Sequence, residues 1–433
     1  MSEIEKRTMS KVTWRLVPFL MLCYFIAYLD RVNISFAGGS MSKDLGLSAA
    51  AFGGAAGIFF IAYFFFEVPS NMALDRFGAR IWIARIMFTW GLITGAQAFV
   101  QGELSLNIVR LLLGVAEAGF FPGIIFFLTL WFPAAYRARI IGLFMFAIPI
   151  STVIGAPISG LILNMDGAAG LHGWQWIFII EALPALIMAV IVFFYLTDRP
   201  RLAGWLSKDE SDWLQDQLDA ERANRDRHGV LSIMRSMVDW RIIALGFVYM
   251  GCNIPQYGLS FFLPQIVKAF GGLSNLQVGF VTALPYAVGA IGMILWSRHS
   301  DQMAERKWHA VIPLLIIMLA LAAAASVADP TIKMAFLCVA GFGFFAVLPV
   351  FWTLPTTFLS GTSAAVGIAA VNSIGNLGGF FGPQIFGKLK DETQADYAPI
   401  MFLAACALIG AILVLILGHN PAQERIVKQH AGE

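Results

Sequence analysis

Residues 14–38 read WRLVPFLMLCYFIAYLDRVNISFAG. The stretch is long enough to cross a bilayer, since a transmembrane helix needs about 20 mostly apolar residues. It also contains two adjacent charged residues, Asp30 and Arg31. A charge at the centre of a spanning helix costs about 2.5–3.5 kcal/mol. The stretch therefore predicts a membrane helix, and its two charges call for an explanation in terms of partners or function.

The composition of the whole chain is that of a membrane protein. It is 58% apolar and 13% charged, whereas soluble domains are roughly 45–50% apolar and about 25% charged. The net charge of +2 is too small to indicate a nucleic-acid partner. The four cysteines lie in apolar segments without the spacing of a metal site or a disulfide framework, so we expect core residues and no metal or cofactor. No signal-peptide cleavage site follows the first stretch, which should be the first transmembrane helix.

Further stretches of this kind recur along the chain and predict an all-α membrane protein with twelve transmembrane helices in two six-helix halves. They lie near residues 14–38, 50–73, 81–101, 104–131, 138–163, 174–197, 241–270, 275–297, 309–328, 331–359, 363–388 and 397–419. We expect an N-terminal half at 1–197, a linker at 198–240, a C-terminal half at 241–419 and a tail at 420–433.

The basic residues predict the orientation of the helices. Apart from Arg31 and Arg110, which lie inside spans, most of the 29 Lys and Arg residues fall in the termini, the even-numbered loops and the linker. Basic residues are enriched in cytoplasmic loops, so both termini and the linker should be cytoplasmic. The odd-numbered loops hold only Lys43, Lys268, Lys333, Lys388 and Lys390.

The linker contains a helix start signal. Ser207 and Glu210 have the spacing of a capping box, and Trp213, Leu214 and Leu218 follow at helical spacing. We expect an amphipathic helix on the membrane surface that joins the halves and packs beneath them.

A matched pair of segments supports the division into halves. Predicted helix five carries GAPISG at 155–160, and helix eleven, in the corresponding place of the second half, carries FGPQIFG at 381–387. Gly and Pro in spanning helices allow close approach of neighbouring helices. The pair is typical of helices that rock against each other, although Gly and Pro are also simply common in membrane helices.

Ionisable residues inside the predicted spans indicate a site. Arg110 and Glu117 lie seven residues apart, so they project from one helix face about 10.5 Å apart along the axis and cannot pair tightly. Asp30 and Arg31 point about 100° apart, so they can face different neighbours, one of them a central cavity. These four predict a polar, water-accessible centre, with buried structural ion pairs as the alternative. Two further carboxylates, Glu67 and Glu181, are interpreted as structural.

The chemistry of the four charges divides them into two roles. Arginine stays protonated and its planar fork fits a carboxylate, so Arg31 and Arg110 are candidates for substrate binding. A carboxyl group in a low-dielectric site can instead hold a proton and release it when the cavity opens to the other side. Asp30 and Glu117 are therefore candidate proton carriers.

Uncharged polar residues give a weaker signal for the rest of the pocket. Asn372 and Asn376 lie one turn apart on one helix face, and Trp352 precedes a Thr- and Pro-containing segment. Tyr28 and Tyr63 could add hydroxyl contacts. All five are candidate substrate-binding residues, with interhelical hydrogen bonding as the alternative for the second-half polar residues.

The loop sequence NMALDRFGAR at 71–80 resembles the loop signature of the major facilitator superfamily. Asp75, Arg76, Gly78 and Arg80 match it, while Asn71 and Ala79 depart from it. Asp301, in the corresponding loop of the second half, keeps part of the pattern. The resemblance implies that these residues tie helix ends together in one state of an alternating-access cycle.

Within that superfamily, CYFIAYLDRVNISFA at 23–37 and RLLLGVAEAGFFPG at 110–123 resemble the anion:cation symporters. The resemblance implies proton-coupled uptake of carboxylates, with Asp30 and Glu117 in proton coupling and Arg31 at the substrate carboxylate. Arg110 matches the position of an arginine of that family.

The segments FEVPSN at 66–71 and GARIWIARIM at 78–87 resemble the bacterial tartrate, phthalate, nicotinate and hydroxyphenylacetate permeases. Helix five reads AIPIST at 147–152, without the Gln of some sugar-acid members, which disfavours a sugar acid. We therefore expect a hydroxy-dicarboxylate such as tartrate, or an aromatic carboxylate.

The expected protein is a monomeric, proton-coupled uptake transporter of the inner (plasma) membrane, not an enzyme. Its partners would be a small organic anion, protons and the lipid bilayer. A proton-driven exporter of amphipathic compounds is the alternative, although the two arginines beside the acids argue against it. A membrane sensor is a third class, but the linker at 198–240 is too short for an added domain.

Overall fold

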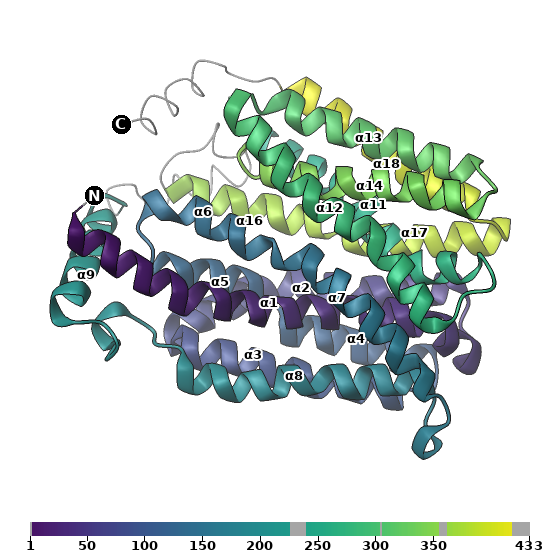
Figure 1. Ribbon diagram of the computed structural model, residues 1–433, viewed down its shortest axis with the longest axis horizontal. Helices are drawn as coiled ribbons and strands as arrows, with labels where there is room; N and C mark the ends of the chain where they lie inside the picture. The colour runs from purple at the N-terminus through teal and green to yellow at the C-terminus, as the bar shows by residue number, and fades with distance from the viewer. Residues whose placement is uncertain (1, 226–239, 304, 355–361, 418–433) are drawn as a thin grey trace.

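The protein is described here from a computed structural model, which describes residues 2–225, 240–303, 305–354 and 362–417. Within these ranges the regular secondary structure is helical, without β-strands. Two helical bundles lie side by side, and α1 begins and α18 ends at the same end of the molecule (Figure 1). We call this the terminal end and the opposite one the far end.

Among the described residues, eight helical segments form the first bundle and seven lie in the second. The first contains α1 (Glu3–Leu45), α2 (Ala49–Phe77), α3 (Ala79–Ala96), α4 (Glu103–Glu117), α5 (Phe120–Thr129), α6 (Ala134–Met145), α7 (Ala147–Ile162) and α8 (Gly173–Tyr195). The second contains α11 (Trp240–Lys268), α12 (Asn275–Met303), α13 (Lys307–Ser326), α14 (Pro330–Phe351), α16 (Thr362–Asn376), α17 (Gly378–Thr393) and α18 (Tyr397–Leu417). Short 3-10 turns and α9 (Lys208–Arg225) complete the described elements.

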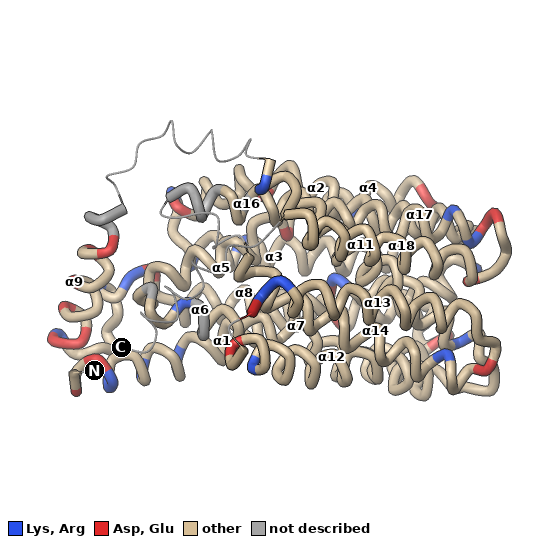
Figure 2. Tube along the Cα trace, turned by 90° about the horizontal axis from the view of Figure 1, so that it is seen from above, with Lys and Arg blue, Asp and Glu red and all other residues tan. Residues whose placement is uncertain are grey.

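The helices form the predicted twelve crossings. Ten helical stretches of the described chain are long and apolar enough to span a membrane. The other two predicted spans correspond to α3 and the pair α16–α17. Lys, Arg, Asp and Glu gather toward the two ends of the bundle, with mostly uncharged chain between them (Figure 2). This distribution fits a protein whose middle lies in hydrocarbon, where charges are costly.

In the part of the chain that the structure describes, three of the predicted spans are broken into two helices. The break that matters most follows Glu117, where Ala118 is extended and Gly119 adopts a φ of 86°. A residue with a side chain is strained at this φ, and a Cβ on Gly119 would lie 2.4 Å from the Ser70 hydroxyl oxygen. The other breaks fall at Phe146, between α6 and α7, and at Leu377, between α16 and α17.

The two bundles meet tightly toward the far end. A Cβ on Gly53 of α2 would lie 2.1 Å from the carbonyl oxygen of Pro383 in α17, and one on Gly279 of α12 would lie 2.4 Å from that of Ala156 in α7. Gly387 approaches the backbone at Ala49 equally closely. The two matched Gly- and Pro-containing segments therefore form contacts between the halves, where small residues let helix backbones touch.

The linker helix α9 packs against the first turns of α1. Ser207 and Glu210 form the predicted capping box, with hydrogen bonds of 2.9 and 3.3 Å. The Glu210 carboxylate also accepts hydrogen bonds from Arg7 at 2.8 Å and Lys11 at 2.9 Å, both in α1. Burial acts to raise the pKa of Glu210, but the hydrogen bonds from Lys11, the Ser207 backbone and Arg7 outweigh it and lower this pKa to about 2.

Candidate substrate and proton site

A cavity lies between the two bundles, near the middle of their helices. One polar side is formed by Arg31 of α1, and the opposite side by Asn253, Gln256, Asn372 and Asn376 of the second bundle. Aromatic side chains form much of the wall between them. In this conformation the cavity has a volume of about 40 Å³, enough for a few water molecules. The cavity must widen to admit an organic acid.

Arg31 is the one charged side chain among the described residues that line this cavity. It is 8% exposed and donates a hydrogen bond to the carboxylate of Glu117 in α4, which is itself buried. Its guanidinium also lies 5.4 Å from the ring centre of Phe59 and 5.5 Å from that of Tyr63, in the range of cation–π contacts. Arg31 is thus held at the cavity wall by one carboxylate and several aromatic faces.

Asp30 points away from the cavity although it adjoins Arg31 in sequence. Its Oδ2 accepts a 2.7 Å hydrogen bond from the indole of Trp90 in α3, and its side chain is buried. Its Oδ1 has no partner in the part of the chain that the structure describes. The roughly 100° rotation between successive helical residues explains why neighbouring charges face different surroundings.

Arg110 lies in a different place from the one the sequence suggested. It is fully buried, and it donates to the backbone carbonyls of Ala55 at 3.3 Å and Ala56 at 3.2 Å, in α2. It does not line the cavity in this conformation. The seven-residue spacing predicts correctly that Arg110 and Glu117 do not pair, since Glu117 pairs with Arg31 instead.

Glu67 joins the two bundles below the cavity, on its terminal side. This buried α2 carboxylate accepts hydrogen bonds from the amide of Asn372 at 3.0 Å and the hydroxyl of Ser373 at 3.4 Å, both in α16. Asn372 also lines the cavity. One residue interpreted as structural and one interpreted as substrate-binding therefore meet across the interface.

The remaining candidates divide between the wall and the layer behind it. Tyr28, Tyr63 and Asn376 line the cavity. Trp352 does not; its ring packs edge-on against Tyr249 with 4.9 Å between centroids, and Tyr249 is the residue at the wall.

Sequence reasoning missed the contribution of α11. Asn253, Gln256 and Tyr257 of this helix line the cavity together with Tyr249. Two amides in the middle of a spanning helix, on either side of Pro255, are the signal that could have identified them, since polar groups inside a membrane face the bundle interior.

The first-half loop residues are predicted to tie helix ends together in one state of a transport cycle, and for Asp75, Arg76, Gly78 and Arg80 this role stays a prediction. Gly78 joins α2 to α3 at a φ of 90°, and the N–H of Arg80 donates to Asp198 at 2.8 Å. Asp75 and Arg76 are exposed and form no ion pair within the described ranges. Asp198, which follows α8, is therefore the acidic residue that ties these helix ends together here.

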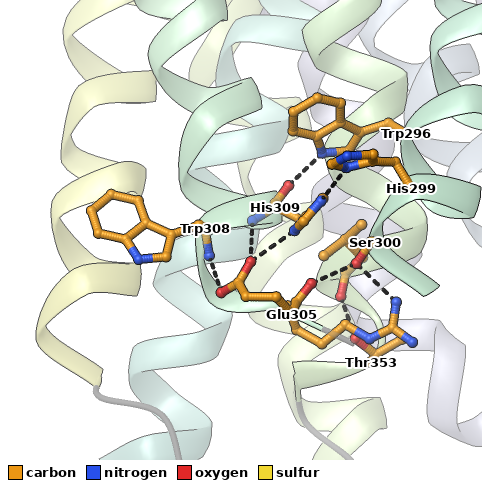
Figure 3. A network of polar contacts seen from close by, with 9 residues as sticks. Trp296, His299, Ser300, Glu305, Trp308, His309 and Thr353 are labelled. Atoms are coloured by element: carbon orange, nitrogen blue, oxygen red, sulfur yellow. Dashed lines mark hydrogen bonds and ion pairs between the residues drawn. The ribbon is translucent and has the colours of Figure 1, made fainter. Parts of the chain in front are cut away.

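The second-half loop, between α12 and α13, forms a polar network at the terminal end (Figure 3). Arg306 pairs with Asp301 at 2.7 Å. Glu305 accepts from the N–H groups of Trp308 and His309 and contacts the His309 ring at 2.7 Å. Burial acts to raise the pKa of Glu305, but these contacts outweigh it and hold that pKa below its ordinary value. The predicted structural role of Asp301 fits this arrangement.

Comparison with known proteins identifies the class. Residues 20–383 match the Major Facilitator Superfamily, so the chain belongs to this superfamily and is a multi-pass membrane transporter, not an enzyme.

Two relatives and one solved structure illustrate the similarity. The chain is 50% identical over 432 residues to an Agrobacterium vitis protein named "Putative tartrate transporter", with 99% of this chain and 96% of the relative covered. It is 42% identical over 415 residues to a "Quinolone resistance transporter" of Acinetobacter baumannii, with 96% of each covered. Its fold is similar to that of a bacterial homolog of the human lysosomal transporter Spinster in an inward-facing, occupied conformation, with a TM-score of 0.76 at 18% identity over 93% of this chain and 96% of that one.

Proposed function

We propose that this transporter takes up a small organic anion bearing a carboxylate, together with protons, across the bacterial inner membrane. The observation that carries the proposal is Arg31, a buried guanidinium at the wall of the cavity between the halves. Such a group binds a carboxylate strongly because its planar fork matches the two carboxylate oxygens. The relative named as a tartrate transporter supports a hydroxy-dicarboxylate as the first substrate to test.

The pairing of Arg31 with Glu117 supplies a reason for proton coupling. While Glu117 is ionised, it occupies the guanidinium that the substrate needs. A proton on Glu117 removes this competitor, and the substrate carboxylate then takes its place. Binding of the anion and binding of the proton therefore favour each other. Asp30, in the same part of α1, would carry a further proton.

The transport cycle follows from the contacts between the halves. We infer that the termini face the cytoplasm, as the distribution of basic residues predicts. The far end, closed by α2 against α17 and α7 against α12, is then the external gate. Glu67 with Asn372 contributes to the internal gate. Rocking of the halves about the cavity would open one gate at a time.

Binding measurements test the proposal. Purified protein should be stabilised against thermal unfolding by carboxylates, with tartrate and nicotinate in the first panel, and not by organic cations. The Arg31→Ala protein should lose this stabilisation, while its unfolding temperature without ligand shows whether it is folded. Equal stabilisation of the Arg31→Ala protein by the same acids would exclude the carboxylate role of Arg31.

A proton-driven exporter of amphipathic compounds is the second candidate. The relative named as a quinolone resistance transporter favours it, and so do the aromatic walls of the cavity. The same panel distinguishes the two, because an exporter of cationic compounds would be stabilised by the cations.

A further inference from the structure

A cluster of buried polar side chains lies inside the first bundle, where α8 packs against α1, α3 and α7. Its members share two properties: each side chain is at most 2% exposed, and each has at least one nitrogen or oxygen without a hydrogen-bond partner in the described chain. They are Asp30, Asn33 and Glu181.

Glu181 of α8 is the second carboxyl group of this cluster. Its Oε1 accepts a 2.6 Å hydrogen bond from the Ser159 hydroxyl of α7, and its Oε2 has no partner within the described ranges. Asn33 of α1 lies near it, although their contact falls short of a hydrogen bond. Asp30 is close enough for its carboxyl group to interact electrostatically with that of Glu181.

Among the described residues, no cation contacts Glu181 to stabilise an ionised carboxylate. The charged or titratable groups facing the cluster are Asp30 and, beyond it, Glu117 and Arg31, and Arg31 is engaged by Glu117. The described hydrogen bonds to these acids from α3 and α7 come from neutral side chains, Trp90 to Asp30 and Ser159 to Glu181. An unpaired buried carboxylate is costly, so either acid readily takes up a new proton after it has given one away. Buried polar atoms that lack protein partners are usually bridged by water.

The three side chains lie at different depths along the axis of the first bundle. Helix α8 begins at the far end, and Glu181 lies eight residues into it, about 12 Å along the axis. Asn33 lies one turn closer to the far end than Asp30 on α1. Helices α1 and α8 run in opposite directions and are aligned by the hydrogen bond from Trp174 to Asp44 near the far end. Counting along both helices from this contact places Glu181 first, then Asn33 and then Asp30, on the way toward Arg31 at the cavity.

We propose that Glu181 is a proton-binding residue on a route by which protons reach Asp30 from the far end, through water held by the buried polar cluster. This inference rests on the proposed proton coupling. In the transfer step, protonated Glu181 donates its proton through a bridging water to the Asp30 carboxylate. The Glu181 carboxylate that remains takes the next proton from the external solution. Ser159 keeps Glu181 in place throughout.

The Glu181→Gln variant separates this role from a structural one. Glutamine keeps the shape of the side chain and an oxygen that can accept from Ser159, but it cannot carry the proton. In proteoliposomes with tartrate as the probe, tartrate-driven proton uptake should fall about tenfold or more, because a positioned proton-transfer group is removed. Exchange of tartrate for tartrate without a gradient should stay near the wild-type rate. Glu181→Asp, which retains a carboxyl group, should recover part of the proton flux.

Two further measurements make each outcome decisive. Exposed Glu103, at the start of α4, provides the matched control, and Glu103→Gln should behave as wild type. Infrared spectra of the protein in membranes should contain a protonated-carboxyl band that Glu181→Gln lacks. Undiminished proton flux in Glu181→Gln, or an unchanged band, would overturn the inference. A wild-type protein that binds tartrate yet moves no protons with it would overturn the proposed coupling itself. In that case, loss of the infrared band in Glu181→Gln would show only that Glu181 is protonated, and not that it takes part in transport.

Discussion

At the scale of single residues, the contact between Arg31 and Glu117 explains why two adjacent charges are tolerated in a membrane helix. Arg31 faces the cavity and the α4 carboxylate, whereas Asp30 faces α3. Helix geometry makes this divergence predictable, because successive residues point about 100° apart. The location of Arg110 was not predictable, since only the packed structure reveals the two α2 carbonyls that its side chain meets.

Asn372 has a second contact that the sequence did not predict. It lines the cavity and also donates to Glu67 across the interface. Asn372→Ala would remove an amide from the cavity and leave Glu67 with the weaker contact to Ser373. The dissociation constant of the bound acid should rise about two- to tenfold, as expected for one lost hydrogen bond. Isothermal titration calorimetry measures this, and an unchanged constant would place the substrate away from Asn372.

At the scale of helices, the breaks define the site as much as the continuous segments do. Glu117 is the last residue of α4 because Ala118 and Gly119 leave the helical conformation directly after it. Apolar length alone predicts one uninterrupted span over 104–131. Gly119 followed by Pro122 was an available signal for the break, because Pro is favoured in the first turn of a new helix.

The contact of α2 with α17 should be sensitive to added volume. A Cβ on Gly53 would lie 2.1 Å from the Pro383 carbonyl oxygen, far inside van der Waals contact. Gly53→Ala should therefore favour conformations in which the far end is open, seen as a longer distance between spin labels on the far ends of α2 and α17. Gly142→Ala is the control, since no atom lies within 4 Å of its added Cβ. Equal distances in both variants would show that this contact does not set the closed state.

The contact of α9 with α1 should contribute to stability in a pH-dependent way. The pKa of Glu210 is lowered to about 2 in the folded protein. Its contribution is therefore fully present above the ordinary carboxyl pKa of about 4.3 and is lost as pH falls toward 2. Glu210→Gln should lower the free energy of unfolding at neutral pH by at most about 1 kcal/mol, because solvent weakens ion pairs to the half-exposed Arg7 and Lys11.

Unfolding temperatures of the wild type and Glu210→Gln, recorded from pH 7 down to about 3, check this dependence. The difference between the two proteins should be constant above about pH 5 and shrink below it. A difference that persists unchanged at the acid end would contradict the ion-pair origin of the effect.

At the scale of the molecule, the apolar stretches were sufficient to predict two six-helix halves. The number of apolar stretches does not change when the helix ends are misplaced by a few residues. The cavity was predictable only in part. The charges of α1 and α4 stand out against apolar neighbours, but Asn253 and Gln256 become site residues only because α11 lies opposite α1 in the folded bundle.

The central claim is that a substrate carboxylate and a proton replace the Arg31–Glu117 pair together. Proteoliposomes containing Glu117→Gln test it most directly, with accumulation of a bound acid measured under an inward proton gradient and exchange measured without one. Glutamine stays neutral, so the protein should exchange the acid but lose accumulation driven by pH. Undiminished accumulation by Glu117→Gln would contradict the account.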